Sequence, residues 1–449
     1  MKRKHKKRRR YRLTQKGKIA VGVLLSAILC CVLFIVLVKQ GVFEYVEAQI
    51  VRFSSENPTI YLYQNATDES AMTYITSNNA YGADAVLLKK SHHRYLIQVA
   101  GVQAWVNESD VELLDEVNVA YLSHYSKNGD GDLVHSISAD LTQTNFTDWI
   151  IGAAPSSLKE GTVYYSYDGH FFYDNINLML SDLKSGSFTQ AVNDVAYYNY
   201  YQYLPLRSTS SISEEMMDAW FWNERYDWAV NSILTGKAQL FKNVSGFNPL
   251  LVFGIAMNES GLGTSEYATT RYNLFGLNAV DSDPDQASYY SSIENCIDTF
   301  TGYYLNHIFM NPQDLRYAGG YLGDKQSGIN VSYASDPYWG EKAAGYAYQI
   351  NKYSSYSDTT YRTAVKMNED VINIRLAPNL EAGVIATVDE KNFSAIVLEE
   401  VKGSEVDGSD VWLKIQLDYP IDANAQVNLG LPYDEMYAVG YVHSQTFTR

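Results

Sequence analysis

The longest apolar stretch of the chain lies near its start. Residues 19–38 form an apolar run of twenty residues, and the preceding segment 1–18 holds eleven Lys or Arg and no acid. A helix of this length can cross the hydrocarbon core of a bilayer. The positive-inside rule would keep the basic segment in the cytoplasm and leave everything after the span outside. The small-residue cleavage site before Gln49 is loose, so the pattern favours an uncleaved single-pass membrane anchor.

A second apolar run, within 247–265, has a different character. Asn248 can cap a helix, and residues 250–257 are apolar on nearly every face, which is typical of a short helix inside a soluble core. Glu259 follows, just before Gly261 ends the helix. Burial would raise the pKa of such a carboxyl and keep it protonated as a general acid. The alternative is an exposed glutamate at a helix C-terminus.

The remaining patterns predict an α+β multidomain chain. Short strand-like runs separated by turn residues favour one small β-barrel over 58–114 and a second β-rich module over 361–446. Helical spacing appears over 213–241, where Trp220 belongs to the apolar face. Residues 115–150 mix short apolar runs with Asn, Asp, Gly and Ser, and Asp130-Gly131-Asp132 within them reads as a turn rather than a calcium loop.

Charge and composition narrow the class of partner. The net charge is −16, and removing the eleven basic residues of the first segment leaves −27 on the rest of the chain. So negative a surface argues against nucleic acid as a partner, and the basic segment is explained more simply by membrane orientation. The 38 tyrosines suit carbohydrate stacking, although core packing and strand preference explain most of them.

The positions of the cysteines and histidines argue against an internal disulfide and against a metal site. Cys296 is the only cysteine after the apolar span, so the exported part cannot form an internal disulfide. This pattern fits an exported bacterial protein, most simply a Gram-positive one. Asp168 and His170 read as a turn aspartate and a surface histidine, because no third ligand lies at metal-ligand spacing. We therefore expect neither a metal nor a cofactor.

Three motifs occur in order along the middle of the chain. They are Glu-Ser-Gly-Leu-Gly-Thr-Ser at 259–265, Asn-Leu-Phe-Gly at 273–276, and Asn-Val-Ser-Tyr-Ala-Ser-Asp-Pro-Tyr-Trp-Gly-Glu-Lys at 330–342. Together they resemble the bacterial endo-β-N-acetylglucosaminidases of glycoside hydrolase family 73. That resemblance implies a mainly α, lysozyme-like catalytic domain, which with its lead-in spans 155–353. Segments of the two flanking modules resemble bacterial SH3-like domains.

The resemblance implies roles for six residues. Glu259 would be the general acid, and Tyr333 would orient a water or bond the N-acetyl group. Asn273 and Phe275 would line the cleft, and Ser265 would take part in substrate binding. Glu294 is chosen as the second carboxylate; its alternative is a glutamate favoured by a helix N-terminus, and the acetamido group of the substrate could replace a second acid. Other acids considered for this role are Asp281, Asp283, Asp285, Asp298 and Asp336.

The expected function is that of a membrane-anchored, cell-surface autolysin. It would cleave the β-1,4 bond between N-acetylglucosamine and N-acetylmuramic acid in peptidoglycan glycan strands, for wall remodelling or strand trimming. Two rivals stay open: a lytic transglycosylase, and a wall-binding protein without activity. A partner membrane protein also stays open, but the sequence offers no site for it.

Overall fold

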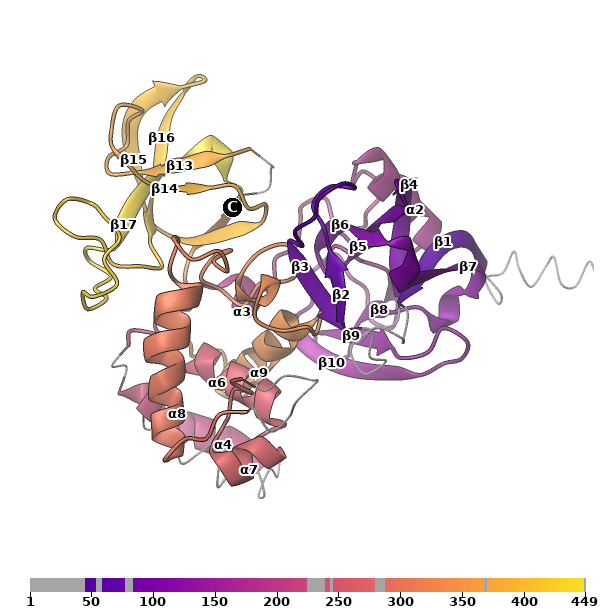
Figure 1. The fold of residues 1–449 in the computed structure, drawn as a ribbon, viewed down its shortest axis with the longest axis horizontal. Helices are drawn as coiled ribbons and strands as arrows, with labels where there is room; N and C mark the ends of the chain where they lie inside the picture. Colours follow the sequence, from indigo (N-terminus) through magenta and orange to yellow (C-terminus); the bar gives the residue numbers. More distant parts are fainter. Residues whose placement is uncertain are drawn as a thin grey trace, which may run out of the picture.

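The computed structural model divides into two β-rich parts and a helical part between them (Figure 1). In that view the N-terminal strands lie on the right, the helices at the lower left and the C-terminal sheet at the upper left. The structure describes residues 45–53, 59–76, 84–223, 239–242, 245–278, 287–366 and 370–447.

The first β-rich part holds an antiparallel sheet in the order β6-β5-β4-β1-β7 and a separate β2-β3 hairpin. Ile60, Ile97 and Val106 are fully buried in its core, as strand alternation predicts. Its first strand lies upstream of the predicted module start at residue 58. The strands are β1 (Tyr45–Phe53), β2 (Thr59–Leu62), β3 (Thr73–Thr76), β4 (Asp84–Ser91), β5 (Arg94–Val99), β6 (Val102–Asn107) and β7 (Val111–Asn118).

A second sheet lies mostly within residues 115–150, where no strand was predicted. It has the order β10-β9-β8-β11, with β8 (His124–Lys127), β9 (Asp132–Ser138), β10 (Phe146–Ala153) and β11 (Val163–Tyr164). Six of the seven residues of β9 are buried, and four of these six are polar: Asp132, His135, Ser136 and Ser138. Because a polar residue is normally read as exposed, these side chains hide the pattern of a buried strand.

The helical part is built around α6 (Pro249–Ser260) and α9 (Trp339–Tyr353). The two helices approach so closely that a Cβ on Gly254 would lie 2.5 Å from the Ala343 carbonyl oxygen. Around them lie α3 (Tyr200–Tyr203), α4 (Glu214–Asn223), α7 (Glu266–Arg271), α8 (Ile293–Thr299), the π-helix η4 (Phe300–Phe309) and the 3₁₀ turn η5 (Ile329–Val331). The helix α2 (Ile176–Ser185) packs instead against the N-terminal sheet, beside β4 (Figure 1).

The local prediction for α6 is confirmed. The Asn248 side chain accepts hydrogen bonds from the amides of Leu250 and Leu251, and Gly261 ends the helix in the left-handed region at φ 54°. All residues from 249 to 257 are buried. The helix is therefore apolar all round because every face packs inside the helical part.

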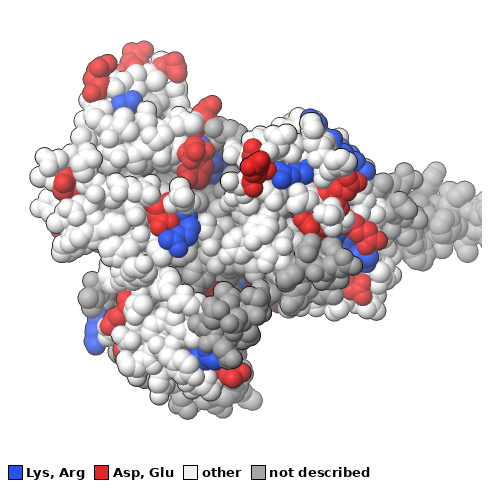
Figure 2. Space-filling model, in the orientation of Figure 1, with Lys and Arg blue, Asp and Glu red and all other residues white. Residues whose placement is uncertain are grey.

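The C-terminal part is a sheet in the order β12-β15-β16-β17-β13-β14. Arg207, from the helical part, is buried against it and donates a 2.9 Å hydrogen bond to the Asp418 carbonyl oxygen. Acidic side chains gather over the tip of this sheet, while much of the visible surface is uncharged (Figure 2). The strands are β12 (Thr363–Lys366), β13 (Ile372–Arg375), β14 (Val384–Val388), β15 (Phe393–Val406), β16 (Ser409–Gln416) and β17 (Val439–His443).

The predicted fold class needs correction at the N-terminus. The basic segment 1–18 and the apolar run 19–38 lie outside the described residues. No helix that the structure does describe is long and apolar enough to cross a membrane, and the longest of them, α9, has 15 residues where a span needs about 20. The predicted transmembrane helix, and with it the predicted single-pass location at the cell membrane, is not supported.

Candidate active site

Glu259 stands in the last turn of α6, where two helices meet. Its Oε1 accepts a 2.6 Å hydrogen bond from the indole Nε1 of Trp339, the first residue of α9. The Trp339 side chain is only 2% exposed, so the donor is held in place by the core. Because α6 and α9 pack tightly, this contact fixes the position of the carboxyl group.

The surroundings of Glu259 change its acidity. Burial raises the pKa of its carboxyl group to about 7, and the negative charge of Asp336 acts in the same direction. The hydrogen bond from Trp339 opposes both effects, because it favours the charged form. The result is an acid that is substantially protonated near neutral pH, as general acid catalysis requires.

A glycine brings the 273–276 loop against the carboxyl group. Gly276 has φ 61°, and a Cβ built on it would lie 3.1 Å from Oε2 of Glu259. Both the backbone conformation and the contact favour a residue without a side chain. The loop backbone can thus approach the acid more closely than it could with any other residue there.

Tyr333 joins this loop to Trp339. Its hydroxyl donates a 2.9 Å hydrogen bond to the Phe275 carbonyl oxygen, and its ring centroid lies 4.8 Å from that of Trp339. Burial, reinforced by the charge of Glu259, raises the pKa of the phenol well above its usual value. Tyr333 therefore stays neutral, and it stands beside the acid as the motif resemblance implied.

Asn273 and Phe275 support the loop. The Asn273 amide group donates to the Leu277 carbonyl oxygen at 2.9 Å and accepts from the Leu277 amide at 3.0 Å. The Phe275 ring stacks on Phe300 with centroids 3.8 Å apart. Both side chains are almost fully buried, so they shape the loop that carries Gly276.

Glu294 and Ser265 lie at helix N-termini. The pKa of Glu294 is lowered by hydrogen bonds from its own backbone amide and from Ser292, the cap of α8. Ser265 caps α7 and accepts from the Ala268 amide at 3.2 Å. No hydrogen bond or ion pair among the described residues joins either side chain to Glu259.

Of the other candidate acids, Asp336 and Asp298 lie in the described part of the chain. Asp336 accepts a 2.8 Å hydrogen bond from Lys342 Nζ and a 2.9 Å bond from the Tyr338 amide at the start of α9. Asp298 accepts from Gln239 at the surface. Asp281, Asp283 and Asp285 lie outside the described residues. Asp336 thus acts on Glu259 through its charge, while its oxygens are held by the helix start.

The N-terminal β-hairpin holds the Tyr333 loop, a relationship that sequence reasoning missed. The Thr73 hydroxyl donates to the Val331 carbonyl oxygen at 2.7 Å, and the Thr76 amide donates to the Ser335 carbonyl oxygen at 2.8 Å. These partners are separated by more than 250 residues, so no local pattern could have revealed the contact.

Lys325 holds the same loop from inside the protein. Its side chain is fully buried, and Nζ donates to the carbonyl oxygens of Asn330, at 2.8 Å, and of Ala334. Burial lowers the pKa of Lys325 to about 7, against the opposing influence of Asp336 and Asp324. In the described part of the chain, no group of three or more His, Cys, Asp or Glu side chains could hold a metal ion.

The region around Glu259 is similar in sequence to known proteins. Residues 236–352 match the family model described as mannosyl-glycoprotein endo-beta-N-acetylglucosaminidase. Proteins from two strains of Streptococcus pneumoniae, each named "Putative endo-beta-N-acetylglucosaminidase", are 29% identical to the chain over 274 residues, or 57% of it. The chain spans only 40% and 38% of their lengths.

Solved structures give a weaker likeness. A crystal structure of Staphylococcus aureus autolysin E is 18% identical, covers 35% of this chain and 73% of its own, and has a TM-score of 0.26. Its complex with a muropeptide is 16% identical, covers 45% and 88%, and has the same TM-score. These likenesses carry no inference about the site.

The family match confirms the resemblance seen in the motifs: residues 236–352, with Glu259 and Tyr333 among them, form a glycoside hydrolase domain of the endo-β-N-acetylglucosaminidase family.

Proposed function

We propose that the chain hydrolyses the β-1,4 bond between N-acetylglucosamine and N-acetylmuramic acid in peptidoglycan glycan strands, with Glu259 as the general acid. The observation that carries the proposal is the environment of Glu259, whose pKa burial raises to about 7 while Trp339 holds its carboxyl group in place. The family match covers residues 236–352, and the chain spans only 40% and 38% of the two relatives. Both the bond that is cleaved and the role in the cell wall are therefore proposed.

The proposed reaction uses the proton on Glu259. The carboxyl group gives this proton to the leaving oxygen as the bond from that oxygen to the anomeric carbon breaks. A water then adds to the anomeric carbon and returns a proton to the Glu259 carboxylate. Tyr333 donates its own proton to the Phe275 carbonyl oxygen, so its hydroxyl oxygen is oriented to accept a hydrogen bond from the acetamido N–H of the substrate.

Two groups are candidates for stabilising the anomeric carbon: the Glu294 carboxylate and the acetamido group of the substrate. Glu294 is the carboxylate proposed from the motif, but the structure gives it a role at the start of α8. The alternative is attack by the acetamido oxygen of the substrate, which needs no second acid. We expect Glu294→Gln to separate the two: a loss of hydrolysis comparable to that of Glu259→Gln supports the carboxylate, and near-normal hydrolysis supports the acetamido group.

Product chemistry separates the proposal from its rivals. A hydrolase of this kind releases fragments that end in reducing N-acetylglucosamine, whereas a lytic transglycosylase leaves an anhydro-muramyl end. A wall-binding protein without activity releases no fragment. Mass spectrometry of purified peptidoglycan after incubation with the protein distinguishes these three outcomes.

A further inference from the structure

A cavity of about 330 Å³ opens where three parts of the chain meet. The N-terminal sheet contributes Gln98 and Gln103, the helical part contributes Gln326, and the C-terminal part contributes Asn392. Its volume falls in the range of small-molecule sites, roughly 300–1,000 Å³. Glu259, Tyr333 and Trp339 are not among the residues that line it.

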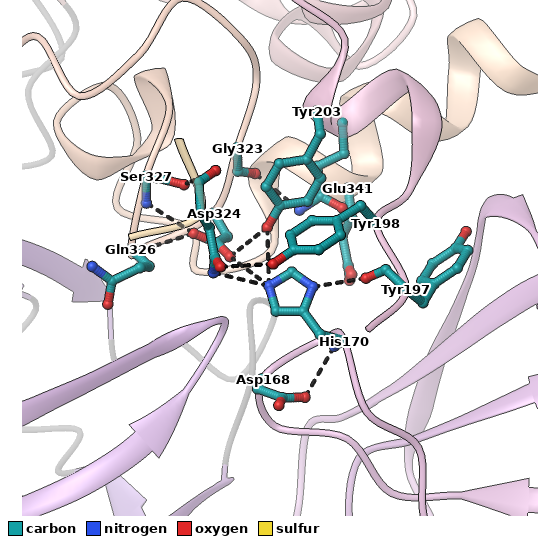
Figure 3. Close-up of polar contacts among 12 residues, drawn as sticks. Asp168, His170, Tyr197, Tyr198, Tyr203, Gly323, Asp324, Gln326, Ser327 and Glu341 are labelled. Carbon is teal, nitrogen blue, oxygen red and sulfur yellow. Dashed lines mark hydrogen bonds and ion pairs between the residues drawn. The ribbon is translucent and has the colours of Figure 1, made fainter. Parts of the chain in front are cut away.

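Side-chain amides give this cavity its polar character. Gln98 donates to the Tyr167 carbonyl oxygen at 3.2 Å, so it is held in place. Gln64, Gln103 and Gln326 also line the cavity, and within the described part of the chain their side chains make no hydrogen bond. Figure 3 shows the Gln326 side chain extending away from the polar cluster to which its backbone is bonded. These three amides offer both donors and acceptors to a ligand.

An aromatic pair forms the apolar wall. The rings of Phe171 and Phe188 stack with centroids 4.1 Å apart and an interplanar angle of 14°, and both residues line the cavity. Leu183 and Met72 extend this wall. A lining that combines side-chain amides with aromatic carbon suits a ligand that has hydroxyl or acetamido groups and a flat apolar face.

A buried hydrogen-bond cluster holds part of the cavity lining in place, and its His170 and Tyr198 are labelled in Figure 3. The Nε2 atom of His170 lies 3.0 Å from the Asn392 side-chain nitrogen, and its Nδ1 atom lies 2.8 Å from the Tyr197 carbonyl oxygen. Tyr198 donates to the Asn392 side-chain oxygen at 2.9 Å. The cluster links the helical part to the C-terminal part, so a ligand would meet a preformed surface rather than a mobile one.

We propose that this cavity is a saccharide-binding site, formed jointly by the three parts of the chain. The amide-rich lining includes one lysine, Lys391, one acidic side chain, Asp168, and the imidazole of His170, whose two nitrogens already contact Asn392 and Tyr197. A ligand rich in carboxylates, such as a wall peptide, would require an excess of positive charge that this lining does not provide. A neutral N-acetylated sugar matches the amides through its hydroxyl and acetamido groups and the aromatic wall through its ring face.

The site is tested by equilibrium dialysis with labelled N,N′-diacetylchitobiose. The full chain carries Glu259→Gln so that the probe is not cleaved, and Gln103→Trp is added to fill the cavity from the exposed face of β6. Gln313→Trp, at an exposed position elsewhere, is the matched control. We expect Gln103→Trp to lower the amount of bound sugar by one equivalent per chain at saturation, and Gln313→Trp to leave it unchanged.

Three results would overturn the proposal. The first is equal sugar binding by the Gln103→Trp and control proteins. The second is no binding by either protein at about 10 mM probe, a concentration tenfold above a 1 mM Kd. The third is that Gln103→Trp abolishes binding of an L-alanyl-D-isoglutamine probe but not of the sugar. Circular dichroism shows whether both variants are folded. Cleavage of peptidoglycan by the Gln103→Trp protein with Glu259 intact is measured separately, so the cavity and the proposed hydrolysis can fail independently.

Discussion

The indole nitrogen of Trp339 donates a 2.6 Å hydrogen bond to Oε1 of Glu259, and it thereby joins the first turn of α9 to the last turn of α6. This bond has two effects with opposite consequences for catalysis. It positions the acid, and it stabilises the charged form of the carboxyl group, which lowers a pKa that burial has raised.

We expect Trp339→Phe to shift the pH profile of hydrolysis. Losing a bond that favours the charged form raises the pKa of Glu259 above its value of about 7. A general acid must be protonated, so activity falls as pH rises through this pKa, and the alkaline limb should move to higher pH by up to about one unit. The measurement is kcat/KM against pH, beside Trp222→Phe at an exposed position. An alkaline limb that moves to lower pH in Trp339→Phe would contradict the assignment.

Gly276→Ala should impair the site without unfolding the helical part. The new Cβ would lie 3.1 Å from Oε2 of Glu259, and the φ of 61° strains any residue with a side chain. We expect kcat/KM to fall by about tenfold or more, equivalent to about 1.4 kcal/mol of lost transition-state stabilisation. The control is Gly302→Ala, where a Cβ meets nothing within 4 Å. Equal activity of the two variants would show that the loop does not approach the acid in this way.

Thr73→Val tests whether the N-terminal hairpin positions the Tyr333 loop. The substitution removes the 2.7 Å bond to the Val331 carbonyl oxygen and leaves that buried acceptor without its donor. A loss of about 1–3 kcal/mol in the free energy of unfolding is expected, together with a lower kcat. Thr59→Val, on the neighbouring strand β2, should change neither quantity. If Thr73→Val lowers stability while kcat and KM stay unchanged, the hairpin supports only the fold.

Local patterns allowed part of this architecture to be predicted. The cap at Asn248, the apolar run and the glycine end defined α6 and the place of Glu259, because all of these signals lie within a few residues of one another. The strands of the C-terminal sheet were also marked by local alternation. A twenty-residue apolar run near the start suggested a membrane helix, but the described chain contains no helix capable of spanning a membrane.

The side-chain roles that the sequence did not predict depend on tertiary contacts. His135 has no local pattern that marks it as buried, yet it lies inside β9 with its Nδ1 2.5 Å from Oε1 of Glu341 on α9. Asn273 suggested a free amide for the substrate, whereas both of its polar atoms are bonded to Leu277. His170 similarly proved to be the centre of a buried cluster. In each case the partner determines the role of the side chain, and the partner is not apparent from sequence spacing.

The most direct test of the account is mass spectrometry of borohydride-reduced fragments released from purified peptidoglycan by the full chain, beside its Glu259→Gln variant. We expect fragments ending in reduced N-acetylglucosamine from the unsubstituted protein, and a decrease of at least about 100-fold in their release by the variant. Circular dichroism verifies that the variant is folded. Equal release by both proteins, or fragments with anhydro-muramyl ends, would contradict the assignment of Glu259 as the general acid of a glucosaminidase.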